Sequence, residues 1–165
     1  MTSSFARYWF PPLAWMALIW GLSSDLGSAD NTSGLFIWIV TALFPSATPA
    51  QIELAHGLVR KLGHLTEYAI LAALWFRALH TGRRLQSMPS ALAALAISIA
   101  WAITDELHQR IVPSRTASPL DVILDTTGAT LALLARRLRN GRPRNAARAV
   151  ERPIMPSTPR RNVSK

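Results

Sequence analysis

The stretch "ALAALAISIAWAIT" (Ala91–Thr104) decides the fold class of this chain. From Met88 to Thr104 no residue is charged on any face of a helix, whereas an amphipathic helix of a soluble protein carries a polar stripe. The next eleven residues, "DELHQRIVPSR" (Asp105–Arg115), include five Asp, Glu, His or Arg side chains. An uncharged apolar helix followed directly by so much charge indicates a membrane span with a polar segment at one end.

Three further segments are mostly apolar. They are Trp9–Leu22, Leu62–Leu79 and Leu120–Leu134, and each reaches the roughly 20 residues of a membrane span when its flanks are included. A fifth segment, "GLFIWIVTALF" (Gly34–Phe44), is too short to cross a bilayer. We therefore predict an all-α polytopic membrane protein, a four-helix transmembrane bundle with a short interfacial or re-entrant helix between spans one and two. The alternative is a soluble four-helix protein.

The net positive charge of the chain is confined to one segment. Ten of the 18 Lys and Arg residues lie in residues 136–165 with a single acid, whereas residues 1–135 carry eight bases and eight acids. The body is therefore neutral, which does not favour a nucleic-acid partner. We predict a transmembrane domain over 1–135 and a basic, disordered cytoplasmic tail over 136–165. The chain has no Cys, which excludes disulfides and Cys-based metal sites.

The basic residues also predict an orientation, because cytoplasmic loops of membrane proteins are enriched in Lys and Arg. Arg7 precedes the first span, and Arg77, Arg83 and Arg84 lie between spans two and three. With the tail, 14 of the 18 basic residues then fall on the cytoplasmic side. We therefore expect a multi-pass protein with both termini in the cytoplasm and its acids near the outer side.

Near the outer side of the membrane, several polar residues lie on helix faces that we expect to point into the bundle. In "RKLGHLTEY", Lys61, His64, Glu67 and Tyr68 share one helical face. His64 and Glu67 lie within the apolar run, so we expect them to face the bundle interior rather than lipid.

The last span, "SPLDVILDTTGATLALL", repeats this pattern with Asp121 and Asp125, which are four residues apart and therefore on one face. Ser118 and Pro119 suit a helix N-terminus, and this accounts for Asp121 but not for the deeper Asp125. Small residues, beginning with Gly128, continue that face and allow close packing. Ion pairing alone is the alternative purpose of all these charges, for example between Arg115 and Asp121 or between Lys61 and Asp105.

Two of these segments carry a resemblance. "RKLGHLTEYAILA" and "DELHQRIVPSRTASPLDVILDTTGA" resemble the VanZ-like family of small bacterial membrane proteins, and "IWGLSSDLGS" resembles the Ser-Ser segment after that family's first helix. The resemblance covers roughly residues 15–135. It implies a bacterial inner-membrane location in the cell envelope. The family's namesake is linked to resistance to the glycopeptide teicoplanin, without an established biochemical activity. The pattern residues implied here are Lys61, His64, Tyr68, Asp105, Glu106, His108, Gln109, Pro113, Arg115, Asp121, Asp125 and Gly128.

This chain departs from the family pattern at three positions. Arg60 stands where the family often has an acid, Ser114 where Gly is common, and Asp125 where Asn is common. These departures bear on any role that needs a charge partner at 60 or a neutral amide at 125.

The first functional hypothesis is an enzyme that acts on a phosphorylated or glycosylated envelope lipid. Histidines would move protons, carboxylates would orient them, act as base or attack, and basic residues would hold an anionic head group. The candidate catalytic residues are His64, Asp105, Glu106, His108, Asp121 and Asp125. The candidate substrate-binding residues are Lys61, Glu67, Tyr68, Gln109 and Arg115.

Two other hypotheses stay open. A metal site would use Glu106, His108, Asp121 and Asp125 with His64 and Glu67. A non-catalytic module would bind an anionic lipid head group at the outer face, or form an ion-pair network only. The expected partners are membrane lipids. The sequence names no cofactor and no metal, and it leaves the oligomeric state open.

Overall fold

The structure, a computed structural model, describes residues 2–24, 29–82, 86–113, 115 and 117–140. All regular structure in these ranges is helical, so the all-α prediction is confirmed for them. The elements are α1 (Thr2–Tyr8), α2 (Phe10–Leu22), α3 (Ala29–Leu43), α4 (Pro49–Arg77), the π-helical turn η2 (Ala78–Gly82), α5 (Ser87–Gln109) and α6 (Pro119–Asn140).

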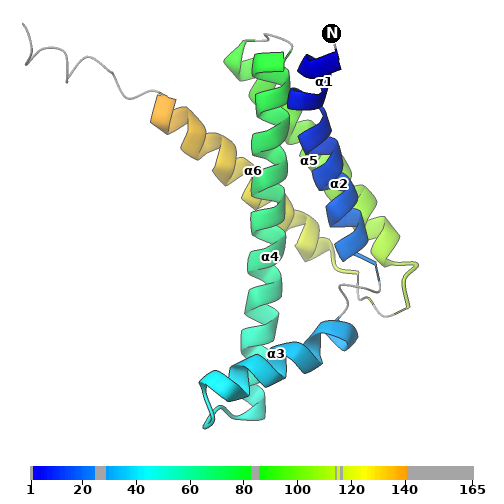
Figure 1. Ribbon diagram of the computed structural model, residues 1–165, viewed down its shortest axis with the longest axis vertical. Helices are drawn as coiled ribbons and strands as arrows, with labels where there is room; N and C mark the ends of the chain where they lie inside the picture. Colours follow the sequence, from blue (N-terminus) through cyan, green and yellow to red (C-terminus); the bar gives the residue numbers. More distant parts are fainter. Residues whose placement is uncertain (1, 25–28, 83–85, 114, 116, 141–165) are drawn as a thin grey trace, which may run out of the picture.

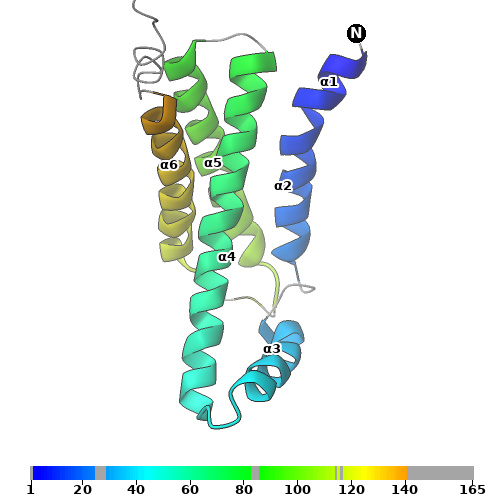
Figure 2. The same ribbon diagram turned by 60° about the vertical axis from the view of Figure 1, so that its left-hand side comes forward.

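Helices α2, α4, α5 and α6 form a bundle in which α4 packs against the other three (Figures 1 and 2). Helix α3 packs across the N-terminal part of α4, away from α5 and α6 (Figure 2). In both views α1, η2 and the end of α6 lie at one end of the bundle. The ends of α2 and α5 and the start of α6 lie at the opposite end, beside the middle of α4. The segments that carry most of the predicted site residues therefore meet there.

Helix α4 begins thirteen residues earlier than the predicted span, at Pro49 rather than Leu62. The Thr48 side chain accepts a hydrogen bond from the Gln51 backbone N–H (3.4 Å), and the Gln51 side chain accepts one from the Thr48 N–H (2.9 Å). This capping box, with Pro49 in the first turn, starts a helix whose first half is too polar to resemble a span. At about 1.5 Å per residue the helix is about 43 Å long, more than the roughly 30 Å of bilayer hydrocarbon.

Helices α5 and α6 also extend beyond the predicted spans. Helix α5 continues through Asp105 to Gln109, so the first half of "DELHQRIVPSR" is the last turn of a helix rather than a loop. Helix α6 continues to Asn140, into the first residues of the predicted tail 136–165. The remainder of the predicted tail, 141–165, lies outside the described residues.

Helix α5 is the one helix among the described residues that is long and apolar enough to cross a membrane. Helix α2 and the segment Thr32–Leu43 are apolar but shorter. Only 22% of the most apolar window of α5 is buried inside the protein. Because the core helix of a soluble protein would be mostly buried, this low burial favours a membrane span over the soluble alternative. The four-span bundle stays a prediction.

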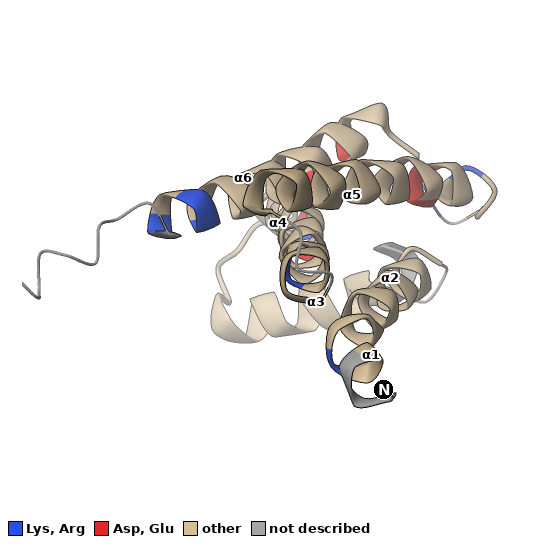
Figure 3. Cartoon of the chain, turned by 90° about the horizontal axis from the view of Figure 1, so that it is seen from above, with Lys and Arg blue, Asp and Glu red and all other residues tan. Residues whose placement is uncertain are grey.

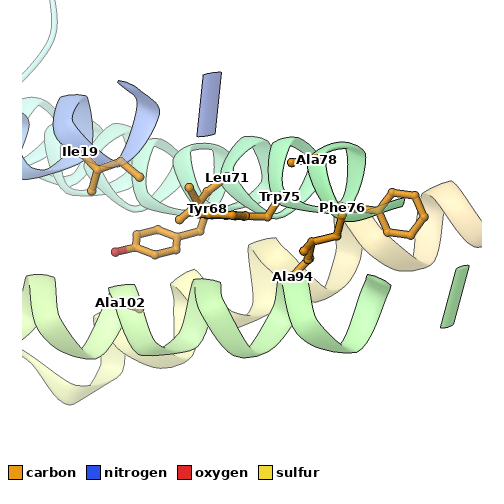
Figure 4. Close-up of a cluster of buried hydrophobic side chains, with 9 residues drawn as sticks. Ile19, Tyr68, Leu71, Trp75, Phe76, Ala78, Ala94 and Ala102 are labelled. Atoms are coloured by element: carbon orange, nitrogen blue, oxygen red, sulfur yellow. The ribbon is translucent and has the colours of Figure 1, made fainter. Parts of the chain in front are cut away.

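The hydrophobic core lies between α2, α4 and α5 (Figure 4). Helix α4 supplies its large side chains at helical spacing, among them Tyr68, Leu71 and Trp75. Ile97 and Trp101 of α5 pack partly buried against this core, whereas the residues that α5 buries over this length are small and recur at intervals of four. These fully or almost fully buried residues are Ser90, Ala94, Ser98 and Ala102.

The two serines of this stripe are satisfied within their own helix. Ser90 Oγ donates to the Gln86 carbonyl (2.8 Å), and Ser98 Oγ donates to the Ala94 carbonyl (2.9 Å). These local bonds satisfy the buried hydroxyl donors, and the small stripe lets α5 approach α4 closely.

Helices α4 and α6 are in close backbone contact at Gly128. A Cβ atom at Gly128 would lie 2.1 Å from the carbonyl oxygen of Leu65 on α4. No side chain fits such a contact with helix backbone, so glycine is required here by space.

We predict that Gly128→Ala lowers the free energy of unfolding by about 1–3 kcal/mol, because the new methyl group must push the two helices apart. The matched control is Gly57→Ala, where a Cβ meets nothing within 4 Å and the change to a better helix former stabilises by about 1 kcal/mol. Thermal unfolding in detergent measures both. Equal melting temperatures for the two variants would contradict the close α4–α6 contact.

Candidate functional site

Polar side chains from four helices are buried at the end of the bundle where α2 and α5 end. We call this group the polar cluster. It consists of Ser23, His64, Tyr68, Asp105, Glu106, Gln109 and Asp125, all buried. The predicted convergence of α4, α5 and α6 at one end is thus observed, with the end of α2 added. That these side chains enclose a ligand pocket stays a prediction.

Asp105 is the residue that links α2 to α5. Its Oδ2 atom accepts hydrogen bonds from Ser23 Oγ (2.7 Å) and from Gln109 Nε2 (3.1 Å). Gln109 lies one helical turn after Asp105 on the same face, which is the continuation of the small-residue stripe of α5. Asp105 is only 1% exposed, and its Oδ1 atom has no hydrogen-bond partner among the described residues. One carboxylate oxygen is therefore held by the protein, and the other has no partner there.

His64 and Asp125 link α4 to α6. His64 Nδ1 and Asp125 Oδ1 are 3.2 Å apart, an ion-pair distance at which their alignment is too poor for a hydrogen bond. The contact follows from the packing at Gly128, because Asp125 lies about one turn before Gly128 and His64 directly precedes Leu65. Asp125 is 2% exposed, so the expectation that it faces the interior is confirmed.

Tyr68 lies one turn after His64 on α4 and is fully buried. Its ring lies between Ile19 of α2 and Ala102 of α5, and its hydroxyl points away from Trp75, toward the end of α5 (Figure 4). Within the described part of the chain this hydroxyl has no hydrogen-bond partner.

Glu106 connects the end of α5 to the start of α6. Its carboxylate accepts a hydrogen bond from the Ser118 backbone N–H. Ser118 Oγ in turn accepts one from the Leu120 N–H (3.3 Å), so Ser118 caps α6 as the sequence predicts. Asp121, in the first turn of α6, is half-buried. Two adjacent acids of α5 thus have separate tasks, since Asp105 faces α2 and Glu106 faces α6.

Arg115 ties the segment after α5 to the end of α2. Its Nε and Nη2 atoms donate to the Ser24 carbonyl (3.3 and 3.1 Å), and Nη2 also donates to the Leu22 carbonyl. These are carbonyl groups at a helix end, which lack partners inside the helix. The predicted role of Arg115 in holding an anion stays a prediction, and the structure adds a positioning role.

His108 lies at the edge of the polar cluster, stacked on Trp20. The ring centroids are 3.9 Å apart and the planes are inclined by 18°. Trp20 also contacts Trp101 at a centroid distance of 5.7 Å. The aromatic contact fixes the plane of the imidazole, whose Nδ1 atom is buried with no hydrogen-bond partner among the described residues.

Three predicted binding residues are not members of the polar cluster, namely Arg115, Lys61 and Glu67. Lys61 is exposed on α4, on the surface that also carries Glu53 and Leu58. Glu67 is half-buried, and its backbone carbonyl accepts a hydrogen bond from Trp15 Nε1 (2.9 Å). Lys61 is thus the predicted site residue that the packing leaves at the surface.

The site residues that the sequence reasoning missed come from α2. Ser23 holds Asp105, and Trp20 holds His108, yet neither was among the candidates. The signal for Ser23 was present, because a pair of serines directly follows the first apolar span. Trp20 gave no signal, since an apolar aromatic residue within an apolar helix is expected to contact lipid or core.

The charges of the helical body are sorted along its length. Acidic positions lie along α4, α5 and α6, whereas arginines gather at the C-terminal end of α6 (Figure 3). Among the described residues, no group of three or more His, Asp or Glu side chains is arranged to hold a metal ion. The arrangement can instead accept hydrogen bonds through carboxylates, donate one through a tyrosine hydroxyl and move protons through imidazole.

Comparison with known proteins agrees with the resemblance. The model of the VanZ/LLP1 family matches residues 8–139. Comparisons with curated proteins and with solved structures give no match. The family match covers every residue of the polar cluster as well as Arg115 and Gly128. Because it spans well over half of the sequence, the chain belongs to the VanZ/LLP1 family.

Proposed function

We propose that the chain is a multi-pass protein of the bacterial inner membrane whose polar cluster binds and acts on the polar head of a phosphorylated or glycosylated envelope lipid. The observation that carries this proposal is a set of buried polar atoms without partners in the described structure. They are the Tyr68 hydroxyl, Asp105 Oδ1 and Gln109 Oε1. More than about 90% of buried polar groups in proteins are hydrogen-bonded, and a purely structural network satisfies its own members.

The contacts of Asp125 and Asp105 support separate chemical roles for these two carboxylates. The Asp125 carboxylate beside His64 orients and stabilises a charged imidazole, the arrangement of a general acid or base. Asp105, held by Ser23 and Gln109 through one oxygen, presents the other as a base or nucleophile. Tyr68 supplies a hydrogen bond to the head group. Glu106, His108 and Asp121 surround this centre, and Arg115 lies at its edge, where a phosphate would be held.

The outward faces of the helices support the membrane location. Large apolar side chains on these faces are exposed, including Leu92 (58%), Ile103 (47%) and Leu131 (52%). A soluble monomer rarely exposes such long apolar surfaces, whereas lipid covers them without cost. Family membership and the candidate span α5 support the same location.

The arrangement of the helix ends supports the orientation. The C-terminal ends of α4 and α6 lie at the same end of the bundle as α1 (Figures 1 and 2), and the last turns of these three helices carry Arg7, Arg77 and the arginines of α6. The enrichment of basic residues on the inner side would place this end in the cytoplasm. The polar cluster would then face outward, toward envelope lipids.

A non-catalytic role is the second candidate, favoured by one observation. His64 and Asp125 compensate each other's charge across the α4–α6 interface, as a purely stabilising ion pair would. A link to teicoplanin-type resistance stays a prediction from the resemblance.

The orientation can be tested directly because the chain has no Cys. Glu53 on α4 and Gln86 before α5 are both exposed and lie toward opposite ends of the molecule. We predict that Glu53→Cys reacts with a membrane-impermeant maleimide in intact spheroplasts, and that Gln86→Cys reacts only after lysis. The reverse pattern would contradict the orientation, and reaction of both before lysis would contradict the membrane-spanning bundle.

The function can be tested by removing one hydroxyl group. We predict that Tyr68→Phe leaves the melting temperature within experimental error of the parent, because the buried hydroxyl has no hydrogen-bond partner to lose among the described residues. The same variant should lose about 10²-fold in lipid turnover if the hydroxyl stabilises the reacting head group. The measurement is mass spectrometry of polar lipid extracts from cells that lack the chromosomal copy and express each variant.

The chain offers a matched control, since its other tyrosine, Tyr8, lies at the opposite end of the bundle. Tyr8→Phe should give the lipid pattern of the parental protein, and Tyr68→Phe that of cells without the protein. A parental lipid pattern from Tyr68→Phe, together with a large loss of stability in His64→Ala, would favour the structural ion pair. Identical lipid patterns with and without the parental protein would contradict the proposal that this protein turns over a lipid.

A further inference from the structure

A second feature lies at the end of the bundle opposite the polar cluster. A groove of about 420 Å³ runs between the start of α5 and the end of α6, within the range of about 300–1,000 Å³ typical of ligand sites. Phe76 of α4 lines it too. On α5 the lining residues recur at helical spacing, as in Met88, Leu92 and Leu95. Leu133 and Leu134 of α6 complete the apolar part.

The groove changes from apolar to cationic along its length. Because α5 and α6 are antiparallel, Leu95 lies at the level of the interior of α6, and Ser87 at the level of its arginines. The distance from Leu95 to Ser87 along α5 is eight residues, or about 12 Å. The Ser87 end of the groove is lined by Arg136 and Arg137. Such a shape suits an amphipathic ligand with an apolar chain and an anionic head.

Arg136 is held in a position to bind an anion. Its guanidinium carbon lies 4.4 Å from the centre of the Phe76 ring, a cation–π contact that fixes the planar group. Its Nε atom is buried and has no hydrogen-bond partner among the described residues. A buried donor without an acceptor is unfavourable. An anionic oxygen at the Ser87 end of the groove would supply the missing acceptor.

The N-terminus of α5 adds positive potential at the same place. The Gln86 side chain in the N-cap position makes no hydrogen bond to the first turn. The first-turn N–H groups of a helix that lack a side-chain cap attract anions, and the helix dipole acts in the same direction. Two arginines and a helix end therefore converge on the Ser87 end of the groove.

We propose that this groove binds one anionic glycerophospholipid, with an acyl chain along Leu92, Leu95 and Leu133 and the phosphate at Arg136 and Arg137. Charge complementarity decides for this occupant, because a basic pocket between helices recognises an anionic head group. The site uses no residue of the polar cluster, so it stands or falls independently of the proposed function.

The test uses the full-length chain purified in detergent, with phosphatidylglycerol and phosphatidylcholine as the two probe lipids. We expect native mass spectrometry to show one bound phosphatidylglycerol and melting temperatures to rise with that lipid only. Arg136→Gln combined with Arg137→Gln should lower the affinity for phosphatidylglycerol at least tenfold. Leu92→Trp, which fills the apolar part, should lower it as well, through lost space rather than lost charge.

The matched control is Arg139→Gln. Arg139 also lies in the last turn of α6, where a cation favours the helix dipole, but it does not line the groove. It should keep parental affinity. Equal binding of the two lipids, equal losses in the combined Arg136→Gln and Arg137→Gln variant and in Arg139→Gln, or a groove covered by a second copy of the chain without bound lipid would each overturn the proposal.

Discussion

The contact between the α6 backbone at Gly128 and the Leu65 carbonyl on α4 is the constraint on which the polar site depends. With no side chain between them, the two helices cross so closely that Asp125 reaches His64, one turn away from the contact. A larger residue at 128 would separate the helices and leave two ionisable groups buried without each other. The same crossing leaves room on the far side of α4 for α2, whose last turn brings Ser23 to Asp105. The absence of a side chain at Gly128 thus sets the distance between the side chains of His64 and Asp125.

Helix α5 combines two properties that are seldom found in one helix. Its outer face is apolar and exposed, whereas its buried face carries small residues over most of its length and then Asp105, Glu106 and Gln109. The small residues bring α5 close to the aromatic side chains of α4, and this closeness makes the buried acids reachable from α2 and α6. Arg115 then binds the end of α2. The ends of α2 and α5, the start of α6 and the middle of α4 are thus joined at one end of the bundle. The acids are tolerated there because each has a defined partner.

Much of this arrangement could be predicted from the sequence. Polar residues at helical spacing within apolar runs are costly unless they meet. Together with the orientation given by the basic residues, this rule predicted His64, Asp105 and Asp125 at one end of an all-α bundle. The start of α4 could not be predicted in this way, because the capping box at Thr48 precedes a stretch whose polar residues give no apolar signal. The roles of Trp20 and Ser23 depend on how α2 rotates against α5, which no local pattern records. Lys61 shares a face with His64 by spacing, yet it lies too far toward the N-terminus of α4 for the other helices to cover it.

The shared face of the small-residue stripe and the buried acids of α5 has a consequence for how such chains can change over generations. Each residue of an α-helix turns the next by about 100°. Insertion or deletion of one residue between Ala102 and Asp105 would therefore rotate the acids out of the bundle while the stripe stayed in place. A change of length at this point of α5 would therefore break the polar cluster, whereas an exchange of residues keeps the frame.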